Sequence, residues 1–398
     1  MRIAYICADA GVPVFGRKGC SIHVQEIIRA FRGQGAAVKL FASRFDGNAP
    51  LDLQPVSIHP LPLLPKGGLA ARERAGVAAN AGLQTALERE GPFDLIYERY
   101  SLWSFAGMHY ARLAGIPGFL EVNAPLIAEQ AEHRGLVDRA GAERVAEKVF
   151  ADATALVAVS TEIKTYLENF PSARGRIHTI PNGVNPNRFR GGLRPARFAS
   201  MDEFTVGFVG TLKSWHGLMT LAEAFAVLRR NDAGLRLLLV GDGPERDTFV
   251  NRVAELGVSE AVRLTGTVDP EEIPGLLASM DVAVAPYPRL PQFYFSPIKV
   301  YEYMAAGLPV IASRIGQLEE LIEHGVTGWL VPPGDAPALA AALKDVRYAP
   351  VSVRERVGAA ARSQVLKHHT WDAAARRIIG LVGFPERQPL LSKVEELN

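Results

Sequence analysis

A lysine and a glutamate lie three residues apart in the segment SPIKVYEYMAAG, which spans residues 296–307. Ser296 is a capping residue type and Pro297 suits the first position of a helix, so we expect a helix to begin here. Lys299 and Glu302 would then share one face of that helix. The cation and the free amides of the helix start suit a phosphate. The carboxylate suits the two hydroxyls of a ribose, at roughly 1.5–3 kcal/mol for each desolvated bond. The alternative is an ordinary surface pair of charges.

A glycine-containing loop follows the expected first strand and reads GRKG at residues 16–19. Gly16 and Gly19 let the backbone approach an anion, and the helix expected next, with Ser21 as a candidate N-cap, adds free N–H groups. The loop is therefore either a cradle for a phosphate or a sugar, or an ordinary turn. It does not match the G-x-G-x-x-G dinucleotide fingerprint or a P-loop.

Loops after three strands of the second half carry further candidates. In the loop GTLKSWHG, Lys213 would neutralise phosphate charge and His216 would donate one more hydrogen bond, although Lys213 could equally be a solvated surface residue. Gly241 lies in the tight turn VGDGP after the next strand. Thr267 and Val268 follow a third strand, where extended backbone could contact the edge of a base.

Polar residues also follow two strands of the first half. Arg99, Glu121 and Asn123 are expected near the mouth of a cleft, where they could orient an acceptor molecule. Glu121 could accept a proton if it is desolvated. The alternative is a structural pair between Glu121 and Arg99.

Short apolar runs alternate with longer helix-like stretches, which predicts right-handed βαβ units and parallel sheets. In the first half we expect helices at residues 21–32 and 141–150 and strands at 2–8, 37–42, 95–97, 118–122 and 155–160. In the second half we expect strands at residues 204–210, 235–241, 261–265, 282–285 and 309–312. The fold class is then α/β, with two doubly wound, Rossmann-like domains facing each other across a cleft and binding ligands at the carboxyl ends of their strands.

The turn-rich segment PNGVNP at residues 181–186 and the Gly-, Arg- and Pro-rich residues 190–197 together predict a hinge. We expect an N-terminal domain at residues 1–184, a C-terminal domain at 185–370 and an amphipathic tail helix within 371–398.

Composition narrows the class of protein. The 398 residues include 44 Lys and Arg against 42 Asp and Glu, for a net charge of +2, which does not favour a nucleic-acid partner. The two cysteines, Cys7 and Cys20, suit a reducing compartment, so we expect a cytoplasmic protein. We find no apolar run of the ~18 residues that a membrane-spanning helix needs. The apolar, basic-flanked segment LPLLPKGGL at residues 61–69 is expected to be a mobile acceptor loop, with peripheral contact at the inner membrane face as the alternative. The oligomeric state stays open.

These segments together resemble the glycosyltransferases of family 4, the retaining group with the GT-B fold. The resemblance runs along nearly the whole chain. Besides SPIKVYEYMAAG, it rests on IPNGV at residues 180–184, VGDGP at 240–244 and GVTGWLVPPGD at 325–335.

The resemblance implies that the second domain binds a nucleotide-sugar donor, that the first binds the acceptor, and that the tail helix crosses back to the first domain. Glu302 matches the second glutamate of the family's E-x(7)-E motif, which holds the donor ribose. The expected donor-binding residues are Gly16, Gly19, His216, Gly241, Thr267, Val268, Ser296, Pro297, Ile298 and Glu302. The expected catalytic residues are Asn123, Glu121, Lys213 and Lys299, and Arg99 and Glu121 are expected to bind the acceptor.

Three positions depart from the family pattern. Tyr294 stands where the first glutamate of E-x(7)-E should be, Thr211 and His216 replace an arginine and a lysine on the diphosphate, and Asn123 replaces a histidine. We therefore expect Lys213 and Lys299 to supply the charge for the phosphates, without a metal or another cofactor.

The expected activity is retaining transfer of a sugar, with UDP as the favoured carrier, to a small-molecule, lipid-linked or glycan acceptor. The alternatives are a nucleotide-sugar 2-epimerase and a degenerate binding subunit.

Overall fold

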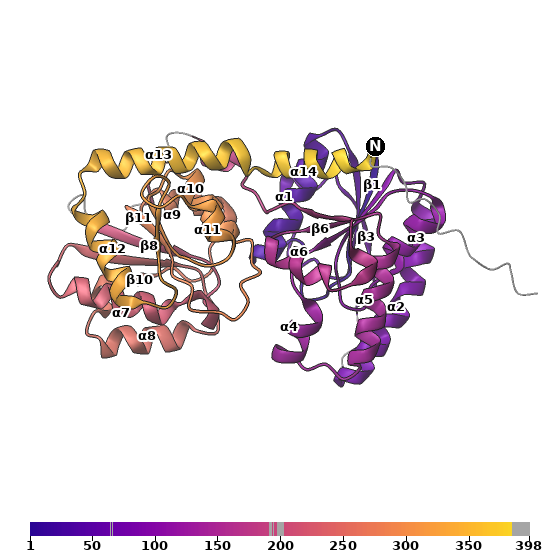
Figure 1. Cartoon of the computed structure of the whole chain (residues 1–398), viewed down its shortest axis with the longest axis horizontal. Helices are drawn as coiled ribbons and strands as arrows, with labels where there is room; N and C mark the ends of the chain where they lie inside the picture. The colour runs from indigo at the N-terminus through magenta and orange to yellow at the C-terminus, as the bar shows by residue number, and fades with distance from the viewer. Residues whose placement is uncertain (64, 66, 191–192, 194, 197–202, 384–398) are drawn as a thin grey trace, which may run out of the picture.

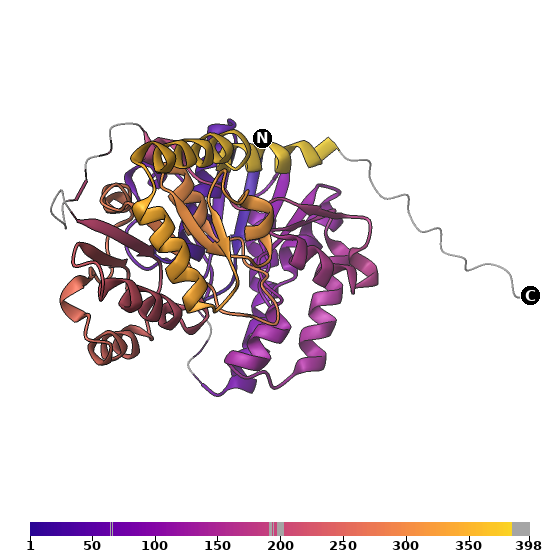
Figure 2. The same cartoon turned by 60° about the vertical axis from the view of Figure 1, so that its left-hand side comes forward.

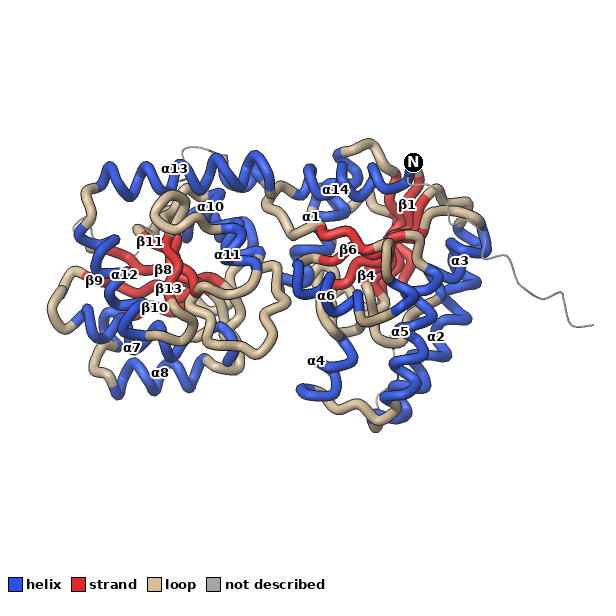
Figure 3. Tube along the Cα trace, viewed as in Figure 1, coloured by secondary structure: helices blue, strands red, loops and turns tan. Residues whose placement is uncertain are grey.

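The computed structural model describes residues 1–63, 65, 67–190, 193, 195–196 and 203–383, and it contains two α/β units (Figure 1). Each unit is built on a parallel sheet with helices around it, as the secondary-structure colouring of Figure 3 shows. The first sheet has seven strands in the order β3-β2-β1-β4-β5-β6-β7, and the second has six in the order β10-β9-β8-β11-β12-β13. Parallel pairing throughout agrees with the predicted βαβ architecture.

The first unit comprises residues up to the end of its seventh strand. Its strands are β1 (Arg2–Cys7), β2 (Ala37–Ala42), β3 (Ser57–Pro60), β4 (Leu95–Arg99), β5 (Gly118–Val122), β6 (Ala155–Ala158) and β7 (Ile177–Thr179). Its helices are α1 (Gly19–Gly33), α2 (Leu69–Glu90), α3 (Ala106–Ala114), α4 (Leu126–His133), α5 (Arg139–Asp152) and α6 (Thr161–Glu168). All five strands expected from the sequence are present, whereas β3 and β7 were not expected.

The second unit carries the remaining strands and helices. Its strands are β8 (Phe204–Val209), β9 (Leu235–Val240), β10 (Val262–Leu264), β11 (Val282–Ala285), β12 (Val310–Ser313) and β13 (Trp329–Val331). Its helices are α7 (Leu218–Arg229), α8 (Arg246–Glu255), α9 (Ile273–Leu277), α10 (Ile298–Ala305), α11 (Gln317–Leu321), α12 (Ala336–Tyr348) and α13 (Val351–His368). The helix α14 (Trp371–Gly380) follows α13 but lies against the first unit.

Both faces of the first sheet are buried. Along β1, Ile3, Tyr5 and Cys7 pack into one hydrophobic cluster, while Ala4 and Ile6 pack into the cluster on the other face. Strands that are covered on both sides read as continuous apolar runs, which is why the sequence predicted them.

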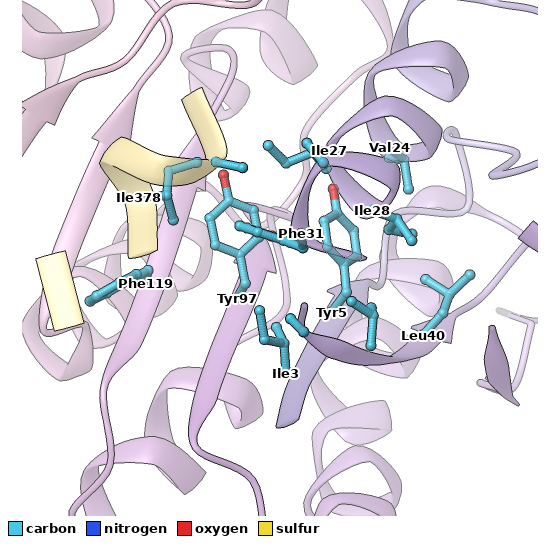
Figure 4. Packing of buried hydrophobic residues seen from close by; sticks show 14 of the residues in the cluster. Ile3, Tyr5, Val24, Ile27, Ile28, Phe31, Leu40, Tyr97, Phe119 and Ile378 are labelled. Carbon is cyan, nitrogen blue, oxygen red and sulfur yellow. The ribbon is translucent and has the colours of Figure 1, made fainter. Parts of the chain in front are cut away.

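Helix α1 covers the first of these two faces of the sheet. In Figure 4 the rings of Tyr5 and Tyr97 stand side by side, with Phe31 of α1 packed against them. Ile378 of α14 joins the same cluster, so the helix that follows the second unit completes the core of the first.

Within the described residues the chain crosses between the units twice, and the two crossings touch. The backbone N–H of Val184, on the outward path, donates to the carbonyl of His369, and the N–H of Trp371, on the return path, donates to the carbonyl of Val184. A Cβ atom at Gly183 would lie 2.5 Å from the carbonyl carbon of Thr370, so a glycine is needed for this approach. Figure 2 shows the returning helices running across both units. The two domains are therefore divided at this double crossing. Of the expected tail at residues 371–398, residues 384–398 lie outside the described residues.

Candidate active site

The loops at the carboxyl ends of the two sheets contact each other where the units meet. The hydroxyl of Ser160, just after β6, donates to the carbonyl of Tyr294 at 3.0 Å, and the side chain of Gln317 donates to the carbonyl of Val159 at 3.1 Å. The glycine loop before α1 reaches the loop after β10 through an ion pair of 2.5 Å between Arg17 and Asp269. The structure thereby brings the glycine loop of the first unit to the loop of the second unit that carries Thr267 and Val268.

Lys299 places a positive charge in a buried position in this region. Its ammonium is buried without a hydrogen-bond partner among the described residues, and it lies 4.3 Å from the centre of the Phe208 ring and 5.5 Å from that of Tyr287. Burial lowers the pKa of Lys299 to about 7. Aromatic faces compensate only part of the cost of burying a cation. An anion beside the ammonium would offset the rest of that cost.

Glu302, one turn further along α10, faces a different partner. Nη1 of Arg188 donates to Oε1 of Glu302 at 2.7 Å. Burial raises the pKa of Glu302, and the positive charge of Arg188 opposes that rise. Lys299 and Glu302 thus lie on one helix, as expected. They are not paired with each other at the surface, which was the alternative to a binding site. Sequence reasoning missed Arg188, which follows the IPNGV motif by four residues.

The start of α10 differs by one position from the expectation. The helix begins at Ile298 with Pro297 at the N-cap, and no side chain caps it. The hydroxyl of Ser296 instead accepts the backbone N–H of Asn182 at 3.0 Å, and the side chain of Asn182 donates to the carbonyl of Ser296 at 2.8 Å. Ser296 therefore joins the two units, because Asn182 lies in the segment that connects them.

The N-cap expected at the glycine loop is also wrong. Helix α1 begins at Gly19, two residues before Ser21, and Lys18 stands at the N-cap without a side-chain hydrogen bond. The hydroxyl of Ser21 is buried inside the first turn without a partner among the described residues. A Cβ atom at Gly16 would lie 2.9 Å from the Pro13 ring, whereas one at Gly19 would meet open space.

The loop after β8 holds the expected His216 in a neutral form. Nδ1 of His216 lies 2.6 Å from the carbonyl oxygen of Thr211, so this nitrogen carries the proton and donates it. Burial, followed by the charge of Lys299, lowers the pKa of His216 to about 2. In this tautomer Nε2 is only an acceptor, which corrects the expectation that His216 donates to a phosphate. Nζ of Lys213 lies over the ring of Trp215, 5.3 Å from its centre.

Gly241 and the base-edge candidates occupy the next two loops. The backbone at Gly241 has φ of +130°, and a Cβ atom there would overlap the carbonyl of Gly210, so close packing of these loops requires glycine. The N–H of Gly241 donates to the carbonyl of Gly266 at 3.1 Å. Thr267 and Val268 lie next in the chain, immediately before the Asp269 that pairs with Arg17.

The first-unit candidates form a closed cluster. Oε1 of Glu121 lies 2.6 Å from Nε2 of His23, and Oε2 lies 3.9 Å from Nη1 of Arg99. Burial alone would raise the pKa of Glu121, but His23 and Arg99 hold it below its usual value. An ionised carboxylate that is 3% exposed is neither a poised base nor open to an acceptor, so the structure favours the structural alternative for Glu121 and Arg99. Asn123 follows β5 and is partly exposed.

Within the part of the chain that the structure describes, no group of three or more His, Cys, Asp and Glu side chains could hold a metal ion. Metal independence stays a prediction. No described helix combines the length and the apolar character that crossing a bilayer requires.

Two parallel α/β units that meet at the carboxyl ends of their strands, joined by a double crossing, form the GT-B fold of glycosyltransferases. The sequence model "Glycosyltransferase Family 4" matches residues 17–188, and "Glycosyl transferases group 1" matches residues 203–347. The chain belongs to the family 4 glycosyltransferases.

Individual relatives agree with this assignment. Glycogen synthase of Mycobacterium tuberculosis is 30% identical over 210 residues, which is 52% of this chain and 48% of that protein, so the match spans about half of the relative. D-inositol 3-phosphate glycosyltransferase of Corynebacterium urealyticum is 28% identical over 342 residues, covering 80% of this chain and 78% of the relative. The solved structure of Anabaena HepE superposes with a TM-score of 0.74 at 20% identity, over 97% of this chain and 100% of that one.

Proposed function

We propose that this protein is a retaining glycosyltransferase that transfers a sugar from a nucleoside-diphosphate sugar to an acceptor hydroxyl. The observation that carries the proposal is the buried ammonium of Lys299. It lies in the first turn of a helix, next to the loop after β8, and it has no counter-charge among the described residues. A diphosphate supplies that counter-charge, and the free amides at the start of α10 add to its binding.

The residues of the second unit would then act on the leaving group. Lys299 and the amides of α10 stabilise the negative charge that develops on the departing diphosphate. Lys213, in the loop after β8, adds a second positive charge. Glu302 accepts the hydroxyls of the ribose, and the backbone at Thr267 and Val268 contacts the base.

Uridine is the base that we favour. The Anabaena HepE structure is described as a complex with UDP and glucose. We expect the nucleotide to bind here to the second unit, within residues 203–383. The acceptor is a small molecule, a lipid-linked sugar or a glycan.

When the acceptor attacks from the face of the sugar that the diphosphate leaves, the configuration is retained, and a base on that same face must take the proton of the acceptor hydroxyl. Because Glu121 is already engaged by His23, we assign this role to the phosphate of the donor itself. The same pairing removes the carboxylate that a 2-epimerase would need, so we do not propose that activity.

Calorimetric titration with UDP, GDP, ADP and NAD, with a divalent cation and with EDTA, tests the proposal. We expect one nucleoside diphosphate to bind in EDTA. The variant Lys299→Met should lose that binding and keep its fold, because Met fills the space without a buried charge. Lys344→Met, at an exposed position of α12, serves as the control and should bind normally. Absence of binding to every nucleotide, or unchanged binding in Lys299→Met, would refute the proposed donor site.

Once the nucleotide is known, transfer is measured directly. The matching nucleotide sugars are incubated with the protein and a panel of acceptors, and the anomeric configuration of the product is read by NMR. A product with the same configuration as the donor is expected. An inverted product would contradict retention while leaving the donor site intact.

A further inference from the structure

The segment that connects the two units sends one side chain into the proposed nucleotide site. Arg188 lies in the short turn Pro186–Phe189, directly after the first crossing between the units. Its Nη1 donates to Oε1 of Glu302 at 2.7 Å, and its Nη2 donates to the carbonyl of Pro270 at 2.7 Å. Both side chains of the ion pair are largely buried, with 19% of Arg188 and 12% of Glu302 exposed. One guanidinium thus fixes the carboxylate of α10 relative to the loop after β10.

Arg188 also lies near a carboxylate of the other unit. The side chain of Asn185 donates to Oε2 of Glu26, on α1, at 2.9 Å. Glu26 is also paired with Arg29, at 3.0 Å. Burial raises the pKa of Glu26 as well as that of Glu302, and Arg188 counteracts the rise at both carboxyls. The positive charge of Arg188 therefore acts on two buried carboxylates, one from each unit.

A ribose makes a specific demand on Glu302. To accept hydrogen bonds from two adjacent hydroxyls, the carboxylate must be ionised and held in one orientation. A guanidinium on Oε1 meets both conditions and leaves lone pairs on Oε2 for the sugar. Without the cation, a carboxylate buried near Glu26 would tend to bind a proton, and one of its oxygens would become a donor.

We propose that Arg188 is a positioning residue for the donor ribose, acting through the carboxylate of Glu302. The inference rests on the proposed function, because it assumes that a nucleotide occupies this site. The simpler role for Arg188 is a structural contact that holds the connecting segment against the second unit. Such a contact would contribute to stability and to overall affinity, but it would not affect how well the protein distinguishes a ribose from a sugar without hydroxyls.

The test compares the affinities of UDP and of 2′,3′-dideoxy-UDP by calorimetry. The wild-type protein should bind UDP more tightly by roughly 100-fold or more, because the dideoxy analogue leaves the buried carboxylate without its hydroxyl partners. In Arg188→Met this ratio should fall at least about tenfold, towards the ratio of Glu302→Gln. The double variant should be no less selective than Glu302→Gln alone, because both substitutions remove the same interaction. Arg188→Lys should recover part of the ratio.

The control is Arg252→Met. Arg252 pairs with Glu223 at 2.8 Å between two helices of the same unit, so its loss removes an arginine–glutamate pair away from the connection. It should keep the wild-type ratio. Thermal unfolding checks that each variant is folded, and Arg188→Lys keeps the test available if Arg188→Met is not.

Each failure has its own signature. A wild-type ratio in a folded Arg188→Met variant would overturn the positioning role, and so would a matching fall in Arg252→Met. Equal affinity of the wild-type protein for both nucleotides would overturn the ribose role of Glu302 and this inference, while nucleotide binding would stand. Binding of neither nucleotide would overturn the proposed UDP donor together with this inference.

Discussion

A Cβ atom at Gly210 would lie 2.9 Å from Nζ of Lys299, so the glycine directly after β8 leaves the space that the buried ammonium occupies. The backbone at Gly210 also has φ of +147°, a conformation that side chains disfavour. The candidate phosphate site therefore depends on the absence of a side chain at Gly210 as well as on Lys299 itself.

Gly210 is needed both for the space beside the ammonium and for its positive φ. Comparison with a glycine that has a positive φ and open space around it separates these two requirements. We expect Gly210→Ala to lose about 1–3 kcal/mol of folding free energy and most of its affinity for nucleoside diphosphate. Gly257→Ala is the control, because Gly257 has φ of +71° and open space around it. It should lose about 1 kcal/mol and bind normally. Urea unfolding and calorimetry measure the two quantities, and normal binding by Gly210→Ala would argue against a tightly enclosed ammonium.

Nucleotide affinity should fall as pH rises above 7. Burial lowers the pKa of Lys299 to about 7, so above that pH most of the free protein carries a neutral amine. A bound phosphate restores the charged form, and binding must therefore take up a proton. The dissociation constant should rise by up to about tenfold per pH unit between pH 7 and 9.

Titrations in buffers of different ionisation enthalpy measure this proton uptake directly. Uptake should approach one proton at pH 8 and should be absent in Lys299→Met. An affinity that stays constant from pH 7 to 9 would mean that Lys299 keeps its charge in the free protein.

The pair between His23 and Glu121 should contribute to stability and not to the chemistry. Both side chains are nearly fully buried, at 3% and 4% exposure, so His23→Ala removes the partner that lies 2.6 Å from a buried carboxylate, while Arg99 stays 3.9 Å away. We expect a loss of about 3 kcal/mol in unfolding free energy and unchanged affinity for the nucleotide.

The matching variant Glu121→Gln keeps the shape of the side chain and removes its charge. It should retain sugar transfer within about threefold, since a structural residue contributes less than the 10²–10⁴-fold typical of a general base. A folded Glu121→Gln protein with transfer reduced a hundredfold would restore Glu121 to the catalytic residues.

The contact between the two chain crossings gives a fourth prediction. Gly183→Ala would place a Cβ atom 2.5 Å from the backbone of Thr370, so the two crossings would have to separate. We expect a loss of about 2–3 kcal/mol. Gly82→Ala, inside α2 with open space around it, is the control and should be neutral or stabilising by up to about 1 kcal/mol. Similar thermal stability for both variants would show that the crossing tolerates separation.

The sequence predicted the fold well because central strands are covered on both faces. Runs such as residues 2–7 are almost entirely apolar, and that pattern is independent of what they contact. The strands β3, β7 and β13 were missed for the opposite reason. Each has three or four residues at a sheet edge, and β3 and β7 contain no fully buried residue.

The site was predicted less completely, because partners are chosen by tertiary structure. Lys299 and Glu302 were identified from their motif, but their environments were not. Arg188 is 114 residues from Glu302, and His23 is 98 residues from Glu121. Ser296 and Ser21 have the residue type of an N-cap, yet the structure gives the first a partner in the connecting segment and buries the second. Local patterns carry no information about such competition.

The touching crossings at Val184 and His369 also restrict how the two units can move. Because the two connections lie side by side, a rotation of one unit about them stretches neither connection. Arg188 and Glu302 both follow the first crossing, so their pair would move as part of the second unit. The exposed pair between Arg17 and Asp269 joins a loop of the first unit to a loop of the second, so a rotation that separates these loops has to break it.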